Sequence, residues 1–144
     1  MPKIKDIERT VLSSPQETID LATKIAAKLQ PGDIAYLYGE LGSGKTVFAK
    51  GLCIGLGIRE EVTSSSFVIV TEYAGKIPVV HIDLYRLDKA AMDMLPIDEY
   101  IISDGITIIE WADRLNTKVG PGLHVKIMIN KQNKREVSIE DHRR

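Results

Sequence analysis

The chain has 144 residues, of which 44% are hydrophobic, and its formal net charge at pH 7 is −1. This length favours a single domain over residues 1–144, and the near-zero net charge excludes the overall basic character typical of nucleic-acid-binding proteins. Cys53 is the single cysteine, which excludes an intrachain disulfide and a zinc site built from cysteines. We find no secretory signal and no apolar run of about 18 residues, and therefore expect a cytoplasmic protein.

The first part of the chain predicts alternating strands and helices. Residues 7–14 alternate enough to form a strand. Residues 14–32 predict a helix whose start carries the serine, proline and glutamate of a capping box with proline in the first turn. The apolar residues 33–39 predict a buried strand, and residues 46–57 predict a second helix.

The second part predicts two hairpins around one further buried strand. The predicted elements are strands at 67–75 and 77–87, short helices over 88–101, a strand at 104–111, and strands at 122–129 and 135–140. Each hairpin has too short a link for a parallel crossover, so its strands are expected to be antiparallel. We therefore predict an α/β fold of three αβα layers, with a mixed sheet that is parallel around residues 33–39 and antiparallel elsewhere.

Residues 39–46, GELGSGKT, match the phosphate-binding pattern G-x-x-x-x-G-K-[ST] between a predicted strand and helix. The glycines let successive N–H groups face one anion, and the helix adds its positive N-terminal end. Lys45 is expected to reach the β- and γ-phosphates, and the Thr46 hydroxyl to ligate Mg²⁺. We predict a P-loop NTPase-like fold; a glycine turn with a spare lysine is the alternative. The predicted nucleotide-binding residues are Gly39, Glu40, Leu41, Gly42, Ser43, Gly44, Lys45, Thr46 and Val47.

Two carboxylates follow apolar strands and are candidates for supporting the metal. Asp83 ends IPVVHID and Glu110 ends GITIIE. Either one could be an ordinary strand-end acid, but two such acids in a P-loop protein favour metal and water chemistry. The predicted catalytic residues are therefore Lys45, Asp83 and Glu110, and the predicted metal ligands are Thr46, Asp83 and Glu110. Trp111 either covers this site or belongs to the core or an interface.

Taken together, GELGSGKT, TSSSF, HIDLYRL and IIEWADRL resemble the TsaE family, also called YjeE, over residues 7–140. The resemblance implies a small ATPase required for threonylcarbamoyladenosine in bacterial tRNA, using ATP and Mg²⁺. It implies that Asp83 supports the metal and that Glu110 is needed for hydrolysis. The further residues that it singles out are Thr63, Ser64 and Ser66 in a switch segment, and His81, Tyr85, Arg86 and Trp111 in the later motifs. Ser65 stands where the family commonly has proline, and this removes a rigid φ angle from the switch.

The resemblance also implies partners. TsaE proteins are expected to act as an ATP-driven switch on a pair of proteins, TsaB and TsaD, of which TsaD carries the transfer chemistry. Residues 118–144 contain seven basic and three acidic residues, a local net charge of +4, which either contacts tRNA weakly or is a solvated end. The alternatives to an ATPase are a small-molecule or nucleotide kinase, against which the lack of an arginine-rich lid argues, and a nucleotide-binding module without turnover.

Overall fold

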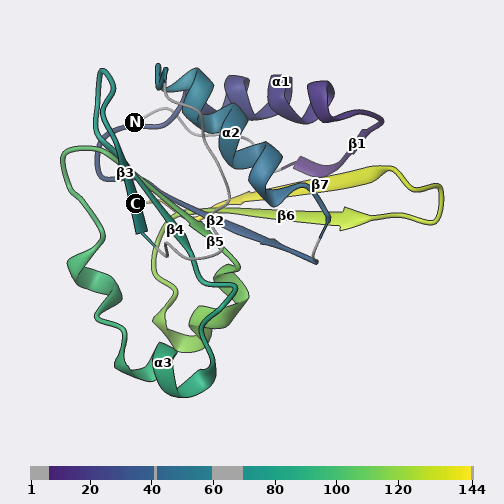
Figure 1. Ribbon diagram of the computed structural model, residues 1–144. Coiled ribbons are helices and arrows are strands. Elements are labelled where there is room, and N and C mark those ends of the chain that lie inside the picture. Colours follow the sequence, from purple (N-terminus) through teal and green to yellow (C-terminus); the bar gives the residue numbers. More distant parts are fainter. Residues whose placement is uncertain (1–6, 41, 60–69, 144) are drawn as a thin grey trace.

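A computed structural model describes residues 7–40, 42–59 and 70–143 (Figure 1). The strands are β1 (Ile7–Leu12), β2 (Ile34–Gly39), β3 (Val70–Tyr73), β4 (Val79–Asp83), β5 (Ile106–Glu110), β6 (Leu123–Ile129) and β7 (Arg135–Asp141). The α-helices are α1 (Pro15–Ala26), α2 (Lys45–Gly55) and α3 (Lys89–Met94), and the 3₁₀ helices are η1 (Ile97–Glu99) and η2 (Ala112–Lys118). No helix in these described ranges is both long and apolar enough to cross a membrane.

The seven strands form one mixed sheet in the order β1-β7-β6-β2-β5-β4-β3. β2 pairs in parallel with β5 and β6, and β5 pairs in parallel with β4. The outer pairs, β1–β7, β6–β7 and β3–β4, are antiparallel, which confirms both predicted hairpins and the mixed sheet. Because the carboxyl ends of β2, β4 and β5 meet at one edge, the residues that follow these strands are brought together.

Helices α1 and α2 pack on one face of the sheet (Figure 1). The capping box of α1 forms as predicted: the Ser14 hydroxyl accepts from the backbone N–H of Glu17, whose carboxylate accepts from the N–H of Ser14 at 3.1 Å. The regular helix stops at Ala26, six residues before the predicted end. Lys28 and Leu29 continue in tighter turns instead, donating to the carbonyls of Ile25 and Ala26.

Short helices cover the opposite face. Met92 of α3, Ile97 of η1 and Leu115 of η2 pack with Ile82 and Ile109 of the sheet. The helix is interrupted at Pro96, as predicted, because proline cannot continue the hydrogen-bond ladder. The result is the expected three-layer arrangement, with a thick layer of two longer helices on one side and a thin layer of short helices on the other.

Candidate functional site

The loop between β2 and α2 has the curled backbone that the glycine pattern predicts. Gly39 has a φ of +153°, and a Cβ there would lie 2.5 Å from Ser43 Oγ and 2.6 Å from the carbonyl oxygen of Ile127, so only glycine fits. Gly44 is the N-cap of α2 and offers no side chain to its first turn. The N-terminal end of α2, with its partial positive charge, is therefore left to a ligand, and an anion such as phosphate fits it.

The Lys45 side chain is folded onto this loop. Its ammonium group donates to the backbone carbonyls of Gly39 and Glu40, the latter at 2.8 Å. Burial lowers the pKa of Lys45, and the nearby carboxylate of Glu110 opposes that shift. Because the loop carbonyls are weak partners compared with a phosphate, the cation is held ready beside the place where an anion would bind.

Trp111 covers Lys45. The Lys45 Nζ lies 3.8 Å from the centroid of the Trp111 ring, within the range of a cation–π contact. The centroid of the Tyr85 ring lies 4.9 Å from that of the Trp111 ring. Trp111 also packs against the hydrophobic core between the sheet and the short helices. Its backbone is in the left-handed region, with a φ of 58°. A bulky residue in this conformation is strained, which is typical of functional sites. Trp111 therefore lies over Lys45 and also packs against the core, as each of its two predicted placements requires.

Glu110 is the carboxylate that contacts the loop. Its Oε1 accepts from the Thr46 hydroxyl at 2.9 Å, and its Oε2 accepts from His81 Nε2 at 2.5 Å. Glu110 is only 1% exposed. It can be so deeply buried because each of its oxygens has a donor.

Asp83 lies beside Glu110 at the same edge, because these two residues are register partners in the parallel β4–β5 pair. The Asp83 Oδ1 accepts from the backbone N–H of Tyr85 at 3.0 Å, and this bond turns the chain out of the sheet. Thr46, Glu110 and Asp83 together offer hydroxyl and carboxylate oxygens. This donor set fits Mg²⁺, which is commonly held by one or two carboxylates while substrate phosphates and waters complete its shell. In the described part of the chain, no three acidic, histidine or cysteine side chains form a complete metal cage.

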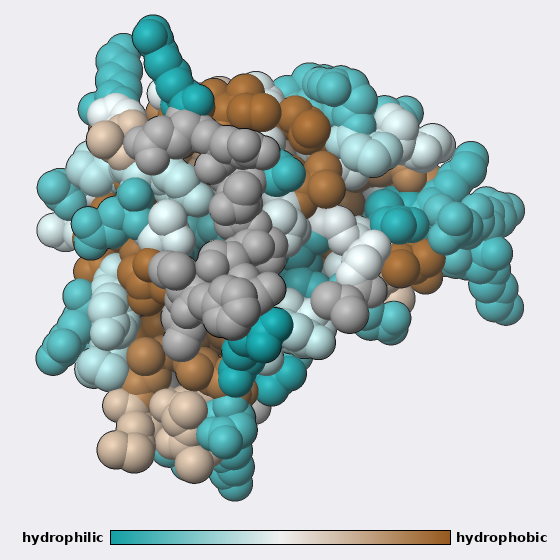
Figure 2. Space-filling view, viewed as in Figure 1, coloured by the Kyte–Doolittle hydropathy of each residue, from teal (hydrophilic) through white to brown (hydrophobic). Residues whose placement is uncertain are grey.

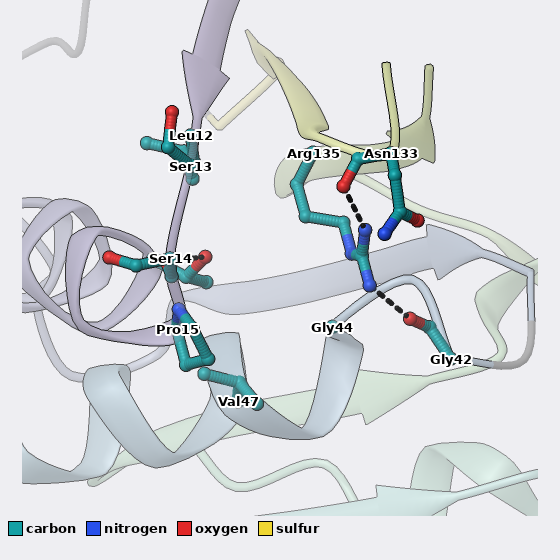
Figure 3. Close-up of a pocket in the computed structure, with 10 residues that line it drawn as sticks. Leu12, Ser13, Ser14, Pro15, Gly42, Gly44, Val47, Asn133 and Arg135 are labelled. Atoms are coloured by element: carbon teal, nitrogen blue, oxygen red, sulfur yellow. Dashed lines mark hydrogen bonds between the residues drawn. The ribbon is translucent and has the colours of Figure 1, made fainter. Parts of the chain in front are cut away.

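A pocket beside the loop was not predicted from the sequence. This cavity of about 200 Å³ is lined by Leu12, Ser13, Ser14, Pro15, Thr18, Gly42, Gly44, Val47, Asn133 and Arg135. Figure 3 shows the Arg135 guanidinium reaching from the β6–β7 hairpin to the loop, while Pro15 and Val47 lie on the side of the helices. Arg135 donates to the carbonyl oxygens of Asn133 and Gly42, each at 3.2 Å. Because its walls come from both ends of the chain, no local motif indicates this pocket.

Comparisons with known proteins agree with this geometry. The family model described as "Threonylcarbamoyl adenosine biosynthesis protein TsaE" matches residues 12–139. The chain belongs to the TsaE family. The tRNA threonylcarbamoyladenosine biosynthesis protein TsaE of Bacillus subtilis is 40% identical over 85% of this chain and 76% of its own length. The protein of the same name from Treponema pallidum is 37% identical over 77% of this chain and 83% of its own length.

A solved structure carries the same fold. The crystal structure of Bacillus subtilis YdiB matches with a TM-score of 0.81 and 33% sequence identity, covering 99% of this chain and 89% of that one. The TsaE assignment, predicted from four sequence motifs, is confirmed. So is the α/β fold.

The structure brings together most of the residues that the TsaE resemblance singled out. Lys45, Thr46, His81, Glu110 and Trp111 form one connected cluster at the carboxyl edge of the sheet. The neighbouring Asp83 and Tyr85 lie at the same edge, whereas Arg86 is exposed. Leu41 and the switch residues Thr63, Ser64, Ser65 and Ser66 lie outside the described residues, so their predicted roles stay predictions.

Arg114 is a further residue that the sequence did not indicate. Its Nη1 donates to the carbonyl of Leu87 at 3.1 Å, and its guanidinium carbon lies 5.7 Å from the Trp111 ring centroid. Arg114 therefore ties the turn after β4 to the cover of the site. The IIEWADRL motif contains this arginine, but only the fold places it against Trp111.

The basic C-terminal segment divides into two groups. Arg143 is buried in ion pairs with Asp33 and Asp141, and Arg135 contacts the loop, so both have structural partners. Lys131 and Lys134 are exposed at the end of the β6–β7 hairpin, where Figure 2 shows hydrophilic residues gathered. Lys126 on β6 is exposed as well, so Lys126, Lys131 and Lys134 are the described lysines of this segment that are open to a partner.

Proposed function

We propose that this chain is a magnesium-dependent ATPase that acts in tRNA N6-threonylcarbamoyladenosine biosynthesis, where ATP binding and hydrolysis switch a complex with TsaB and TsaD. One observation carries the ATPase part: the hydroxyl of the loop residue Thr46 is bonded to Glu110, a buried carboxylate at the end of the strand adjacent to β2. A phosphate-binding loop needs such a carboxylate to support its metal ion. The role in tRNA modification rests on membership of the TsaE family.

The residues divide the work by their chemistry. The glycine loop and the start of α2 supply N–H groups for the phosphates, and Lys45 supplies a cation that turns from the loop carbonyls to the β- and γ-phosphates. Thr46 and Glu110 hold Mg²⁺, with Asp83 beside them. When bound, the ion neutralises charge that develops on the phosphates. Glu110 or Asp83 orients the attacking water, and Trp111 and Tyr85 shield the site from bulk solvent.

The unpredicted pocket is suited to the nucleoside. It adjoins Gly42 and Gly44 of the loop, and it combines apolar walls at Leu12, Pro15 and Val47 with polar groups on the hairpin. Base pockets of this composition are usual, with apolar contact for the ring and a few polar atoms for orientation. The sequence contains no N-K-x-D guanine motif, and this favours ATP over GTP.

The small size of the domain supports a partner-dependent activity. A chain of 144 residues, with a thin layer of short helices beside the site, has little material with which to exclude water alone. TsaB and TsaD would complete the site in the cytoplasm, where tRNA is modified. The exposed lysines at the tip of the β6–β7 hairpin could then meet tRNA weakly or only within the complex.

Phosphate release from ATP, measured for the chain alone and with TsaB–TsaD, tests the proposal. We expect slow release alone and faster release in the complex. Lys45→Ala should lose roughly 2–5 kcal/mol of ATP binding, because a charge-assisted contact is removed. Lys24→Ala, at an exposed lysine on α1, is the matched control and should bind normally. Unchanged ATP affinity in folded Lys45→Ala would refute the phosphate assignment.

Glu110→Gln tests the hydrolytic step separately. The amide can occupy the place of the carboxylate between Thr46 and His81, so the variant should fold, bind ATP and join the complex. Single-turnover phosphate release from the assembled complex should fall by roughly 10²–10⁴-fold if the carboxylate acts as a base. Release at the wild-type rate would move that role to Asp83 or to the switch serines.

A further inference from the structure

We propose that His81 is a positioning residue, which holds Glu110 so that one carboxylate oxygen faces Thr46 and the metal position. This inference rests on the proposed function, because it concerns the same site. Among the described hydrogen bonds none joins His81 to Thr46, and no contact with nucleotide is needed for this role. It acts only through Glu110.

The position of His81 in the sheet makes the contact possible. His81 is the register partner of Ile108 on β5, two residues before Glu110, and Asp83 is the register partner of Glu110 itself. Because side chains alternate along a strand, His81 and Asp83 share one face of β4, and Ile108 and Glu110 share the same face of β5. This is the face on which α1 and α2 pack, since Ile108 belongs to the core beneath them. The imidazole thus reaches diagonally to Glu110 under the start of α2.

Burial makes this bond specific. The side chains of His81 and Glu110 are only 3% and 2% exposed, so water does not compete for either group. The Nε2–H donates to Glu110 Oε2 at 2.5 Å. A leucine would fill this part of the core as well as a histidine does. The imidazole is explained by the carboxylate that it contacts.

The two donors on Glu110 are not equivalent. Thr46 belongs to the loop; its hydroxyl donates to Glu110 Oε1 and keeps lone pairs that can ligate Mg²⁺, so this bond depends on how the loop is placed. His81 belongs to the middle of a buried strand and holds Oε2 whatever the loop does. With Oε2 fixed, the carboxylate does not depend on Thr46 alone for its orientation, and Oε1 stays directed at Thr46 and the metal position. This is the role that partners of metal ligands play in other sites.

Other groups around Glu110 cannot replace this contact. Lys45 influences Glu110 through charge, but its ammonium is bonded to the loop carbonyls and is needed by the phosphates. Asp83 offers carboxylate oxygens, which accept hydrogen bonds and do not donate to a second carboxylate. Among the side-chain hydrogen bonds that the structure describes, the bond from the imidazole is the one that ties the Glu110 carboxylate to a neighbouring strand rather than to the loop.

Two substitutions separate positioning from simple packing. His81→Leu fills the space but removes the donor, whereas His81→Gln keeps a neutral N–H donor of similar reach. His124→Gln is the matched control, because His124 is a half-buried histidine on β6 that stacks on Tyr36 and lies in a different part of the sheet. ATP affinity is measured for each by calorimetry, once with Mg²⁺ and once with EDTA, and folding is checked by the thermal melt.

We expect His81→Leu to reduce the ratio of ATP affinity with Mg²⁺ to that with EDTA by about 10–100-fold, as removal of such partners does in other metal sites. Affinity in EDTA should stay within about twofold, and His81→Gln should restore most of the ratio. Equal losses with and without Mg²⁺, or equal losses in the leucine and glutamine variants, would reduce His81 to a packing residue. If His81→Leu does not fold, His81→Asn, whose amide is too short to reach, replaces it with the same expectation. If the wild type itself shows no magnesium-dependent ATP affinity, the proposed function fails, and not this inference alone.

Discussion

Gly51 controls how closely the loop-bearing helix α2 approaches α1. A Cβ at this position would lie 2.6 Å from Ala22 Cβ and 2.9 Å from the carbonyl oxygen of Ile19, both on α1. Gly51→Ala must therefore push the helices apart by about 1 Å to reach ordinary contact distances, and overpacking of this kind costs about 1–3 kcal/mol. The better helix propensity of alanine offsets about 0.5–1 kcal/mol of this loss of stability. We expect a net loss of about 1–2 kcal/mol, although alanine normally stabilises a helix.

Urea unfolding followed by circular dichroism measures this loss. Ala22→Gly removes one of the clashing atoms, so the double variant Ala22→Gly/Gly51→Ala should show favourable coupling in a double-mutant cycle. Ile54→Ala is the control on the same helix, because Ile54 is 56% exposed and its truncation should change stability little. A Gly51→Ala variant as stable as the wild type, or more so, would refute the close approach. If the displaced helix also carries Lys45 out of place, ATP affinity should fall in parallel.

Three further predictions concern the site and its support. Asp83→Asn should weaken ATP binding in Mg²⁺ more than in EDTA, as measured by calorimetry. If the magnesium dependence of ATP affinity is unchanged, Asp83 is an ordinary strand-end acid. Burial is the largest cause that lowers the pKa of His124, and the charge of the nearby His142 imidazole is the second. The neutral form of His124 therefore contributes fully to stability above the unfolded pKa of about 6.5, and this contribution is lost as pH falls from there through the lower folded pKa. The melting temperature should fall over this pH range, and it should fall less in His124→Gln. Arg143→Met leaves the carboxylates of Asp33 and Asp141 without the buried guanidinium and should lower the free energy of unfolding by roughly 3–5 kcal/mol. A urea midpoint equal to that of the wild type would show that the two ion pairs are dispensable.

Local features of the fold were predictable because their causes are local. The capping box at Ser14, the break at Pro96 and the two hairpins depend on residues a few positions apart, and the structure confirms each of them. The strand order was not predictable in the same way. β2 lies between β5 and β6, which are contributed by residues more than 60 positions later, and only side-chain packing across the whole sheet decides that arrangement. The predicted strand at 77–87 was too long, because the chain leaves the sheet after Asp83, where the Asp83 carboxylate accepts from the N–H of Tyr85.

The same division between local and long-range causes holds within the site. The glycine loop can be predicted from eight consecutive residues, because its curvature depends on their own φ angles. That Asp83 and Glu110 lie at one edge of the sheet follows once β4 and β5 are known to be parallel. Which oxygen meets which donor could not, because the Thr46–Glu110–His81 chain exists only once β4, β5 and β2 lie side by side in that order. Arg135 reaches the loop across an even greater distance in sequence. The residues proposed to bind a nucleotide are thus visible as a motif, whereas the residues proposed to orient them are brought together only by the sheet. Variants at such positions, His81 among them, should separate nucleotide binding from metal use.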